Sequence, residues 1–170
     1  MMSEIVEKSH HLLLECSNKK VAVDATCGNG HDTLFLCQHF EQVYAFDIRD
    51  LAIRRTTKIT ANVNNLHLIK DDFHNLFRYL DSCDAIIFNL GFLPGSNKKI
   101  KTNLYHSDTA ILKAYELLDS GGVMVVCCYT KHEGGEEEYQ NIIKALTQSS
   151  IPYTKYAGFQ NDEVLLMARK

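Results

Sequence analysis

Apolar residues recur along the chain in two patterns, short continuous runs and helically spaced stripes. The short runs predict strands at 21–23, 42–46, 66–69, 84–89, 122–129, 153–158 and 163–169. The stripes between them predict helices over 3–16, 31–40, 50–62, 74–80, 107–119 and 135–149. Strands that alternate with helices indicate an α/β fold, a mostly parallel sheet with helices on both faces. The last two strands have no helix between them, which predicts an antiparallel hairpin.

Length and composition favour a single domain over residues 1–170. The chain has 170 residues, 45% of them apolar and only two of them proline, so it can bury a core and is not expected to be disordered. No apolar run reaches transmembrane length, and the polar start of the chain is unlike a signal peptide. We therefore expect a cytoplasmic protein without membrane contact. The six cysteines show no C-x-x-C spacing, which predicts buried free thiols and no metal site.

The first candidate for chemistry is a glycine-rich turn between a strand and a helix, in the segment VAVDATCGNGHDT at 21–33. Gly28 and Gly30 let the backbone approach a ligand closely, and the helix N-terminus offers free N–H groups. The segment is not a dinucleotide G-x-G-x-x-G motif, because Thr33 holds the third glycine position. With Asp24 four residues before the first glycine, it resembles motif I of S-adenosylmethionine (SAM) dependent methyltransferases. An ordinary strand-to-helix turn is the alternative.

Acidic residues follow the next two strands. Asp47 lies about twenty residues after the turn, where doubly wound nucleotide folds place a carboxylate on ribose hydroxyls. Asp50 is a rival, but its place suits the first turn of the next helix. After the third strand, Asp72 and Phe73 fit by spacing the acid and the apolar residue that contact adenine in methyltransferases. Asp71 is the alternate, and one of these two acids is expected to be only a helix cap.

The fourth predicted strand ends in Asn89, at the edge of the sheet where a methyl acceptor meets the cofactor. An Asn followed three residues later by the aromatic Phe92 resembles the N-P-P-[YF] pattern of amino-group methyltransferases, with Leu90 and Gly91 in place of the prolines. The Asn89 carbonyl can accept from an N–H and aim the nitrogen lone pair at the methyl group. The aromatic ring can pack on a planar base. Otherwise Asn89 caps a turn and Phe92 fills the core.

Methylation of an aliphatic amine also needs a proton acceptor, because such an amine has a pKa of about 10. His132 follows the fifth strand and is the candidate acceptor or substrate contact. A surface-loop histidine is the alternative that remains open.

Four segments together, DATCGNGHDT, FDI, FNLGFLPG and YTKHEGGEEE, resemble the small bacterial methyltransferases labelled rRNA methylases. The resemblance covers nearly the whole chain. It implies a Rossmann-like class I methyltransferase fold with seven strands, SAM as cofactor, and a tRNA substrate. Members of this family convert 5-aminomethyl-2-thiouridine at the wobble position to the 5-methylaminomethyl form. The chain departs from the family pattern at Arg49, where Gln is common, at Phe92, where Tyr is common, and at Asp71–His74.

The motifs and the resemblance together assign residues to three roles. Asn89 and His132 are the expected catalytic residues. The expected cofactor site comprises Asp24, Thr26, Gly28, Asn29, Gly30, His31, Asp32, Asp47, Ile48, Asp72, Phe73, Asn89, Leu90 and Gly91. The expected substrate site comprises Phe92, Leu93, Pro94, Gly95, Lys98, Lys99, Lys101, His132 and Glu133.

The net charge of the chain leaves methyl acceptors other than tRNA possible. The formal net charge of −3 counts against extensive RNA contact, so rRNA, a small-molecule amine or a protein side chain are alternative substrates. A nucleotide-binding module without catalysis is a further alternative, and a nicotinamide dehydrogenase fits poorly because of Thr33. A monomer and a homodimer are both compatible with the sequence.

With tRNA as partner, we expect contact with the anticodon arm, whose unpaired bases can be splayed out. Lys98, Lys99 and Lys101 are placed to neutralise nearby phosphates. Replacing all three with Gln should flatten the log–log salt dependence of tRNA affinity by about 0.7 for each phosphate that is no longer neutralised. SAM affinity, measured in parallel, should stay unchanged. Identical salt slopes would place the RNA interface elsewhere, and the next cluster to test would be Arg49, Arg54, Arg55 and Lys58.

Overall fold

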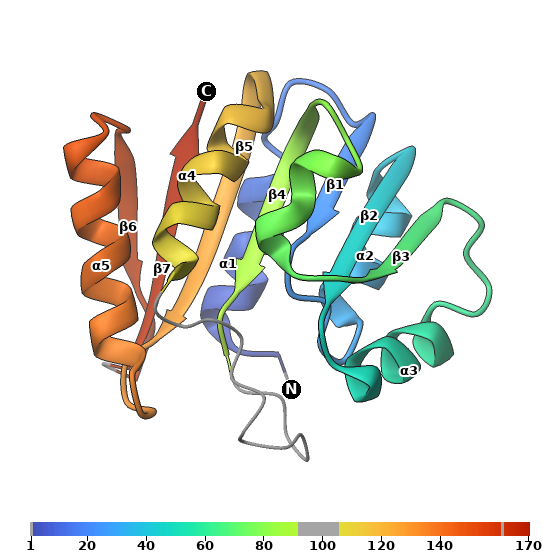
Figure 1. Cartoon of the computed structure of the whole chain (residues 1–170), viewed down its shortest axis with the longest axis horizontal. Coiled ribbons are helices and arrows are strands. Elements are labelled where there is room, and N and C mark those ends of the chain that lie inside the picture. The colour runs from blue at the N-terminus through green and yellow to red at the C-terminus, as the bar shows by residue number, and fades with distance from the viewer. Residues whose placement is uncertain (1, 92–105, 161) are drawn as a thin grey trace.

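A computed structural model of the chain describes residues 2–91, 106–160 and 162–170 (Figure 1). The helices are α1 (Glu4–Leu13), α2 (His31–His39), α3 (Asp50–Ile59), α4 (Ser107–Leu117) and α5 (Gly135–Gln148). The strands are β1 (Val21–Asp24), β2 (Gln42–Asp47), β3 (Leu66–Lys70), β4 (Cys83–Asn89), β5 (Leu118–Tyr129), β6 (Tyr153–Ala157) and β7 (Glu163–Arg169). The helix expected over 74–80 is a 3-10 helix, η1 (Phe73–Arg78). None of the helices in the described ranges is long and apolar enough to cross a membrane.

The strands form one seven-stranded sheet in the order β3-β2-β1-β4-β5-β7-β6 (Figure 1). Strand β7 is antiparallel to β5 and β6, and the other pairs are parallel. Because β1 pairs with both β2 and β4, the winding of the chain reverses after β3. Ligands bind at such a reversal, outside the carboxyl ends of the strands. The class I methyltransferase fold implied by the sequence is confirmed, including the antiparallel hairpin.

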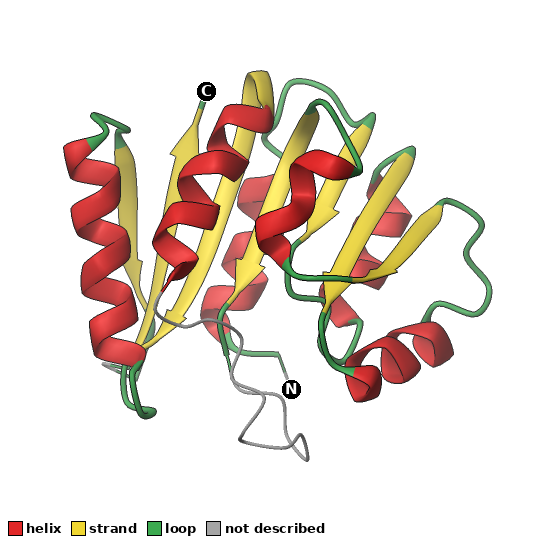
Figure 2. Ribbon diagram, in the orientation of Figure 1, coloured by secondary structure: helices red, strands yellow, loops and turns green. Residues whose placement is uncertain are grey.

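Helices cover both faces of the sheet (Figure 2). Helices α4, α5 and η1 pack on one face, where Phe88 and Met124 are buried. Helices α1 and α2 pack on the other face over Val43 and Ile87, and α3 packs beside them over Ala45. Burial on both faces is typical of parallel strands. Each fully buried large apolar side chain contributes about 1.5–3 kcal/mol, so the strand ends that carry the site are held firmly.

The boundary between α4 and β5 differs from the prediction. Strand β5 begins at Leu118, whereas the sequence predicted a strand over 122–129. The reason is a shift in the pairing of β4 with β5 just after Cys83, which takes the glycine pair into the strand. Gly121 has a φ of 85°, and a Cβ at this position would lie 2.2 Å from the Ser17 hydroxyl oxygen. The glycine pair, which in the sequence indicates a turn, therefore serves here to allow close packing against Ser17.

Glu138 connects the N-terminal ends of α4 and α5. Of the three glutamates that begin α5, Glu138 is buried, with 4% of its surface exposed. Its Oε2 accepts a hydrogen bond from the Ser107 hydroxyl at 3.0 Å. Burial raises the pKa of Glu138 to about 7 from an ordinary value of 4.5. The folded protein therefore holds a proton on Glu138 at pH values where the unfolded chain has lost it.

This proton makes stability depend on pH. Because the pKa is raised in the folded state, its stabilising effect is complete below about pH 4.5 and is lost as the pH rises through about 7. Glu138→Gln should remove this component, so the free energy of unfolding should fall less steeply between pH 5 and 7 than in wild type, by up to about 1.4 kcal/mol per pH unit. Denaturant titrations at several pH values measure this dependence of the free energy of unfolding on pH. Glu137→Gln, at an exposed position of the same turn, should keep the wild-type slope, and a wild-type slope in Glu138→Gln would contradict the assignment.

Candidate functional site

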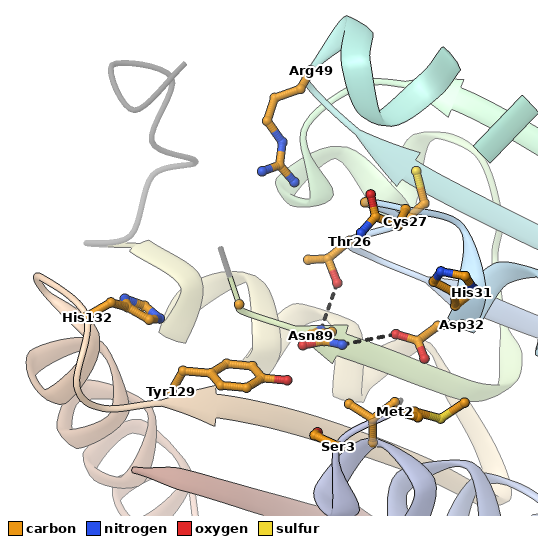
Figure 3. Close-up of a pocket in the computed structure, with 14 residues that line it drawn as sticks. Met2, Ser3, Thr26, Cys27, His31, Asp32, Arg49, Asn89, Tyr129 and His132 are labelled. Atoms are coloured by element: carbon orange, nitrogen blue, oxygen red, sulfur yellow. Dashed lines mark hydrogen bonds between the residues drawn. The ribbon is translucent and has the colours of Figure 1, made fainter. Parts of the chain in front are cut away.

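A cavity of about 590 Å³ opens at the carboxyl edge of the sheet, between the ends of β1 and β4 (Figure 3). It is lined by Met2, Ser3, Val6, Thr26, Cys27, Gly28, Asn29, His31, Asp32, Arg49, Asn89, Gly91, Tyr129 and His132. Seven of the fourteen cofactor residues predicted from the sequence are in this wall, together with His132. The site thus lies where the reversal of the sheet predicts a ligand.

Asp24 organises the glycine turn from beneath and does not line the cavity. Its carboxyl group is fully buried. It accepts one hydrogen bond from the Thr26 N–H at 3.1 Å and another from the Thr33 hydroxyl at 2.6 Å. Burial, with the nearby charge of Asp32 adding to it, raises the pKa of Asp24 to about 8. Asp24 therefore ties the end of β1 to the start of α2, and Thr33 serves as its hydrogen-bond donor.

The two glycines of the turn have different roles. Gly28 lines the cavity and has a φ of 51°, whereas Gly30 begins α2 with a φ of 87°. A Cβ on Gly30 would lie 2.5 Å from Ile59 and 2.9 Å from the backbone of Thr56. Gly30 is therefore required for the approach of α3. The predicted ligand contact at this turn falls on Gly28 and Asn29.

The Asp47 carboxylate at the end of β2 is fully occupied by protein donors. Oδ2 accepts from the Gly28 N–H at 3.2 Å and from Arg49 Nη2 at 2.8 Å. Oδ1 accepts from Arg49 Nε at 2.8 Å and from the Arg49 N–H at 3.1 Å. A carboxylate offers about four acceptor positions, so none is left for a ribose. Ribose hydroxyls can bind Asp47 only after the Arg49 side chain moves away.

A second, much smaller cavity of about 10 Å³ lies beside Asp47 and is bordered by Ile48, Asp71 and Phe73. Of the two acids considered for adenine, Asp72 is the helix cap. It accepts from the His74 N–H at 2.9 Å and from the His74 ring at 2.6 Å, because it precedes the first turn of η1. Asp71, the alternate, is the acid that borders the cavity with Phe73. The Asp71 carboxylate itself accepts from the Asn75 amide at 2.8 Å and from the Tyr79 hydroxyl at 2.5 Å. Which of the two acids contacts adenine stays a prediction.

Asn89 is held at both its backbone and its side chain. Its N–H donates to the Thr26 hydroxyl at 2.7 Å, and its side-chain Nδ2 donates to Asp32 at 3.1 Å (Figure 3). Next to it, a Cβ on Gly91 would lie only 3.0 Å from the ring of Tyr129. The end of β4 is thus clamped against the end of β5, with the Asn89 amide in the cavity wall.

His132 lies in the loop after β5, with its ring in the cavity wall (Figure 3). Its Nε2 is buried and has no hydrogen-bond partner among the described residues. The two glycines after it fix the loop: Gly134 has a φ of 80°, and a Cβ on Gly135 would lie 2.1 Å from the Tyr129 carbonyl oxygen. His132 therefore lines the cavity with a ring whose buried Nε2 has no partner among the described residues. Glu133 is exposed and does not line it.

The remaining predicted residues are placed as follows. Leu90 is buried, and its N–H donates to the Cys127 carbonyl at 3.0 Å. The predicted substrate residues Phe92, Leu93, Pro94, Gly95, Lys98, Lys99 and Lys101 lie outside the described residues.

Six residues of the cavity wall were not assigned to the site from the sequence: Met2, Ser3, Val6, Cys27, Arg49 and Tyr129. Tyr129 carries a usable signal, because it ends a strand at the edge where ligands bind. Met2, Ser3 and Val6 carry none, since they reach the cavity only through the docking of α1 on the sheet.

Comparisons with known proteins agree with this geometry. A family model described as "Putative rRNA methylase" matches residues 43–164. The chain is 31% identical over 135 residues to the Arabidopsis thaliana protein "tRNA (mnm(5)s(2)U34)-methyltransferase, chloroplastic", and the match covers 69% of the chain and 49% of that protein. The chain thus spans about half the length of this curated relative.

Two solved structures are similar over almost their whole length. The crystal structure of a "putative rRNA-methylase" from Clostridium thermocellum is 31% identical with a TM-score of 0.88, covering 100% of this chain and 98% of that one. A "putative methyltransferase" from Streptococcus mutans, solved in complex with SAH, is 30% identical with a TM-score of 0.86, covering 99% and 98%.

The Asp47–Arg49 ion pair predicts that Arg49 competes with SAM. Arg49→Gln should tighten SAM binding by up to about tenfold, equivalent to about 1.4 kcal/mol, because ribose hydroxyls would no longer displace a bidentate guanidinium. Isothermal titration calorimetry measures the affinity. Arg54→Gln, an exposed position in α3, is the matched control and should bind SAM as wild type does. Weaker binding by Arg49→Gln would show instead that the guanidinium contacts the cofactor.

Proposed function

The chain belongs to the rRNA methylase family and is a SAM-dependent methyltransferase, and from this premise we propose that it methylates a primary amine on tRNA. The proposed substrate is 5-aminomethyl-2-thiouridine at the wobble position, and the product is its 5-methylaminomethyl form. We propose that residues 1–170 form a single methyltransferase domain. The observation that carries it is the Asn89 amide, held by Asp32 in the wall of the cavity at the end of β4.

The residues present fit SAM. A cavity of about 590 Å³ is within the range of small-molecule sites. Asp32 in its wall suits the cationic methionine end of the cofactor, and Asp47 suits the ribose once Arg49 has moved. The glycine turn and the start of α2 offer N–H donors for a carboxylate. Bound SAM supplies a methyl group on a positively charged sulfur.

The acceptor amine is oriented by Asn89 in this proposal. The carbonyl oxygen of Asn89 accepts from one N–H of the amine, which turns the nitrogen lone pair toward the methyl group. His132 takes up the proton that an alkylammonium must lose, because its Nε2 is buried beside the cavity without a partner among the described residues. Tyr129 closes the wall, and burial raises the pKa of its hydroxyl, so it stays neutral.

The choice of tRNA is supported by the Arabidopsis relative, which is named as a tRNA (mnm(5)s(2)U34)-methyltransferase. A wobble base in a single-stranded loop can leave its stack and enter a cavity of this size. The predicted substrate segment 92–101 begins three residues after the last residue of β4 in sequence, and we propose that it contacts the anticodon arm.

The test of the proposed function is nucleoside analysis of tRNA incubated with the purified protein and SAM. Substrate tRNA comes from cells that lack the gene, and the expected product is 5-methylaminomethyl-2-thiouridine. Parallel incubations with rRNA and with small amines address the other acceptors. Methylation of one of these, with tRNA left unchanged, would overturn the proposal and keep the methyltransferase assignment.

Asn89→Ala should bind SAM with wild-type affinity yet lose about 100-fold in methylation rate, because the amine is no longer held in line with the methyl group. Calorimetry gives the affinity and single-turnover assays give the rate. Asn62→Ala, at an exposed position away from the cavity, should keep both. A wild-type rate in Asn89→Ala would leave the orienting role without support.

A further inference from the structure

We infer that His10, in the N-terminal helix, is a positioning residue for methyl transfer: acting through Asp32, it holds the Asn89 amide with its carbonyl oxygen toward the cavity. This inference rests on the proposed function, in which that oxygen receives the amine. His10 does not line the cavity, and no sequence motif singles it out.

The three side chains form a continuous hydrogen-bonded chain from α1 to β4. His10 Nε2 lies 2.6 Å from Asp32 Oδ1, and Asn89 Nδ2 lies 3.1 Å from Asp32 Oδ2. His10 and Asp32 are buried, with 6% and 7% of their surfaces exposed. They are brought together by the packing of α1 and α2 on the same face of the sheet.

Hydrogen-bond chemistry fixes the orientation of the Asn89 amide. An ionised carboxylate only accepts, so the NH2 end of Asn89 must face Asp32 and the carbonyl end must face away. The backbone of Asn89 cannot turn to change this, because its N–H is bonded to Thr26. The carbonyl oxygen therefore lies on the side of Gly91, 3.5 Å from where a Cβ on that glycine would lie. Because of Asp32, Asn89 presents its carbonyl oxygen to the incoming amine, and not its NH2 donor.

His10 in turn fixes Asp32. With Asp32 ionised, Nε2 of His10 carries the proton and donates it to Oδ1. The imidazole cannot swing away easily, because it stacks on Phe35 with ring centroids 3.9 Å apart and planes 9° apart. Asp32 is close enough to Asp24 for their charges to interact. Without the His10 donor, the Asp32 carboxylate would lose a strong partner in a buried site and would rotate away from Asn89.

Two substitutions separate positioning from simple packing. His10→Phe keeps a flat ring against Phe35 and removes the donor, whereas His10→Gln keeps an N–H donor near the same place. His11→Phe, at the exposed neighbouring position, is the matched control. At saturating SAM and tRNA we expect His10→Phe to lower kcat by about 10- to 100-fold, with SAM affinity within twofold of wild type. His10→Gln should recover most of the rate, and His11→Phe should match wild type.

A second readout does not depend on the substrate. The side-chain NH2 signals of Asn89, assigned by their loss in Asn89→Ala, should shift and exchange faster with water in His10→Phe than in wild type or His11→Phe. Should His10→Phe not fold, His10→Leu supplies the same comparison, because it also removes the donor to Asp32. Failure of the wild-type protein to methylate tRNA would overturn the proposed function. The NH2 signals of Asn89 would still test whether His10 acts on Asn89 through Asp32. Unchanged Asn89 signals in His10→Phe, or a His10→Gln as slow as His10→Phe, would overturn the inference.

Discussion

The parallel pairing of β1 with both β2 and β4 is the constraint on which the site depends. It sets Asp24 beside Ala45 and Ile87 in register, so the polar ends of three strands meet at one edge. The helices that follow these strands must leave in different directions, and a cavity opens where they part. The apolar strand interiors, buried on both faces, prevent this edge from shifting. The core therefore sets the positions of the glycine turn, the Asp47 carboxylate and Asn89, and hydrogen bonds from Gly28 to Asp47 and from Asn89 to Thr26 join them.

Negative charge is concentrated at this edge, and the protein compensates it in three ways. Asp24 is kept protonated near pH 7 by burial, which raises its pKa, and it accepts hydrogen bonds from two donors. Asp32 receives donors from His10 and Asn89, and Asp47 is paired with Arg49. All three carboxyl groups thus have protein partners without a ligand. A cationic cofactor is favoured here by Asp32, which lines the cavity. At Asp47 the cofactor must displace an arginine, so specificity for the adenosine end comes with a cost in affinity.

The fold was predictable from sequence because its signals are local. The central strands are short apolar runs, and the glycine turn and the hairpin can be predicted without tertiary information. The site was predictable where a residue ends a strand or belongs to the turn, as for Thr26, Gly28, Asp32 and Asn89. Prediction failed where long-range packing decides. Whether Gly30 serves a ligand or α3 depends on contacts between distant segments. His10 and Arg49 likewise acquire their roles only from partners that the folded chain brings to them.

For the proposed amine substrate, the neutrality of Asn89 matters as much as its position. A carboxylate at this place would stabilise the ammonium form and raise the pKa of the amine, and an ammonium has no lone pair for methyl transfer. The Asn89 carbonyl accepts an N–H without this penalty. The negative charge of Asp32 lies behind Asn89, on the NH2 side of its amide. There it polarises the Asn89 amide and strengthens the amide oxygen as an acceptor. Since the methyl group is carried on a cationic sulfur, the same site also disfavours a second positive charge. Asn89 and the cofactor together then favour a neutral amine, and His132 is left to remove one proton.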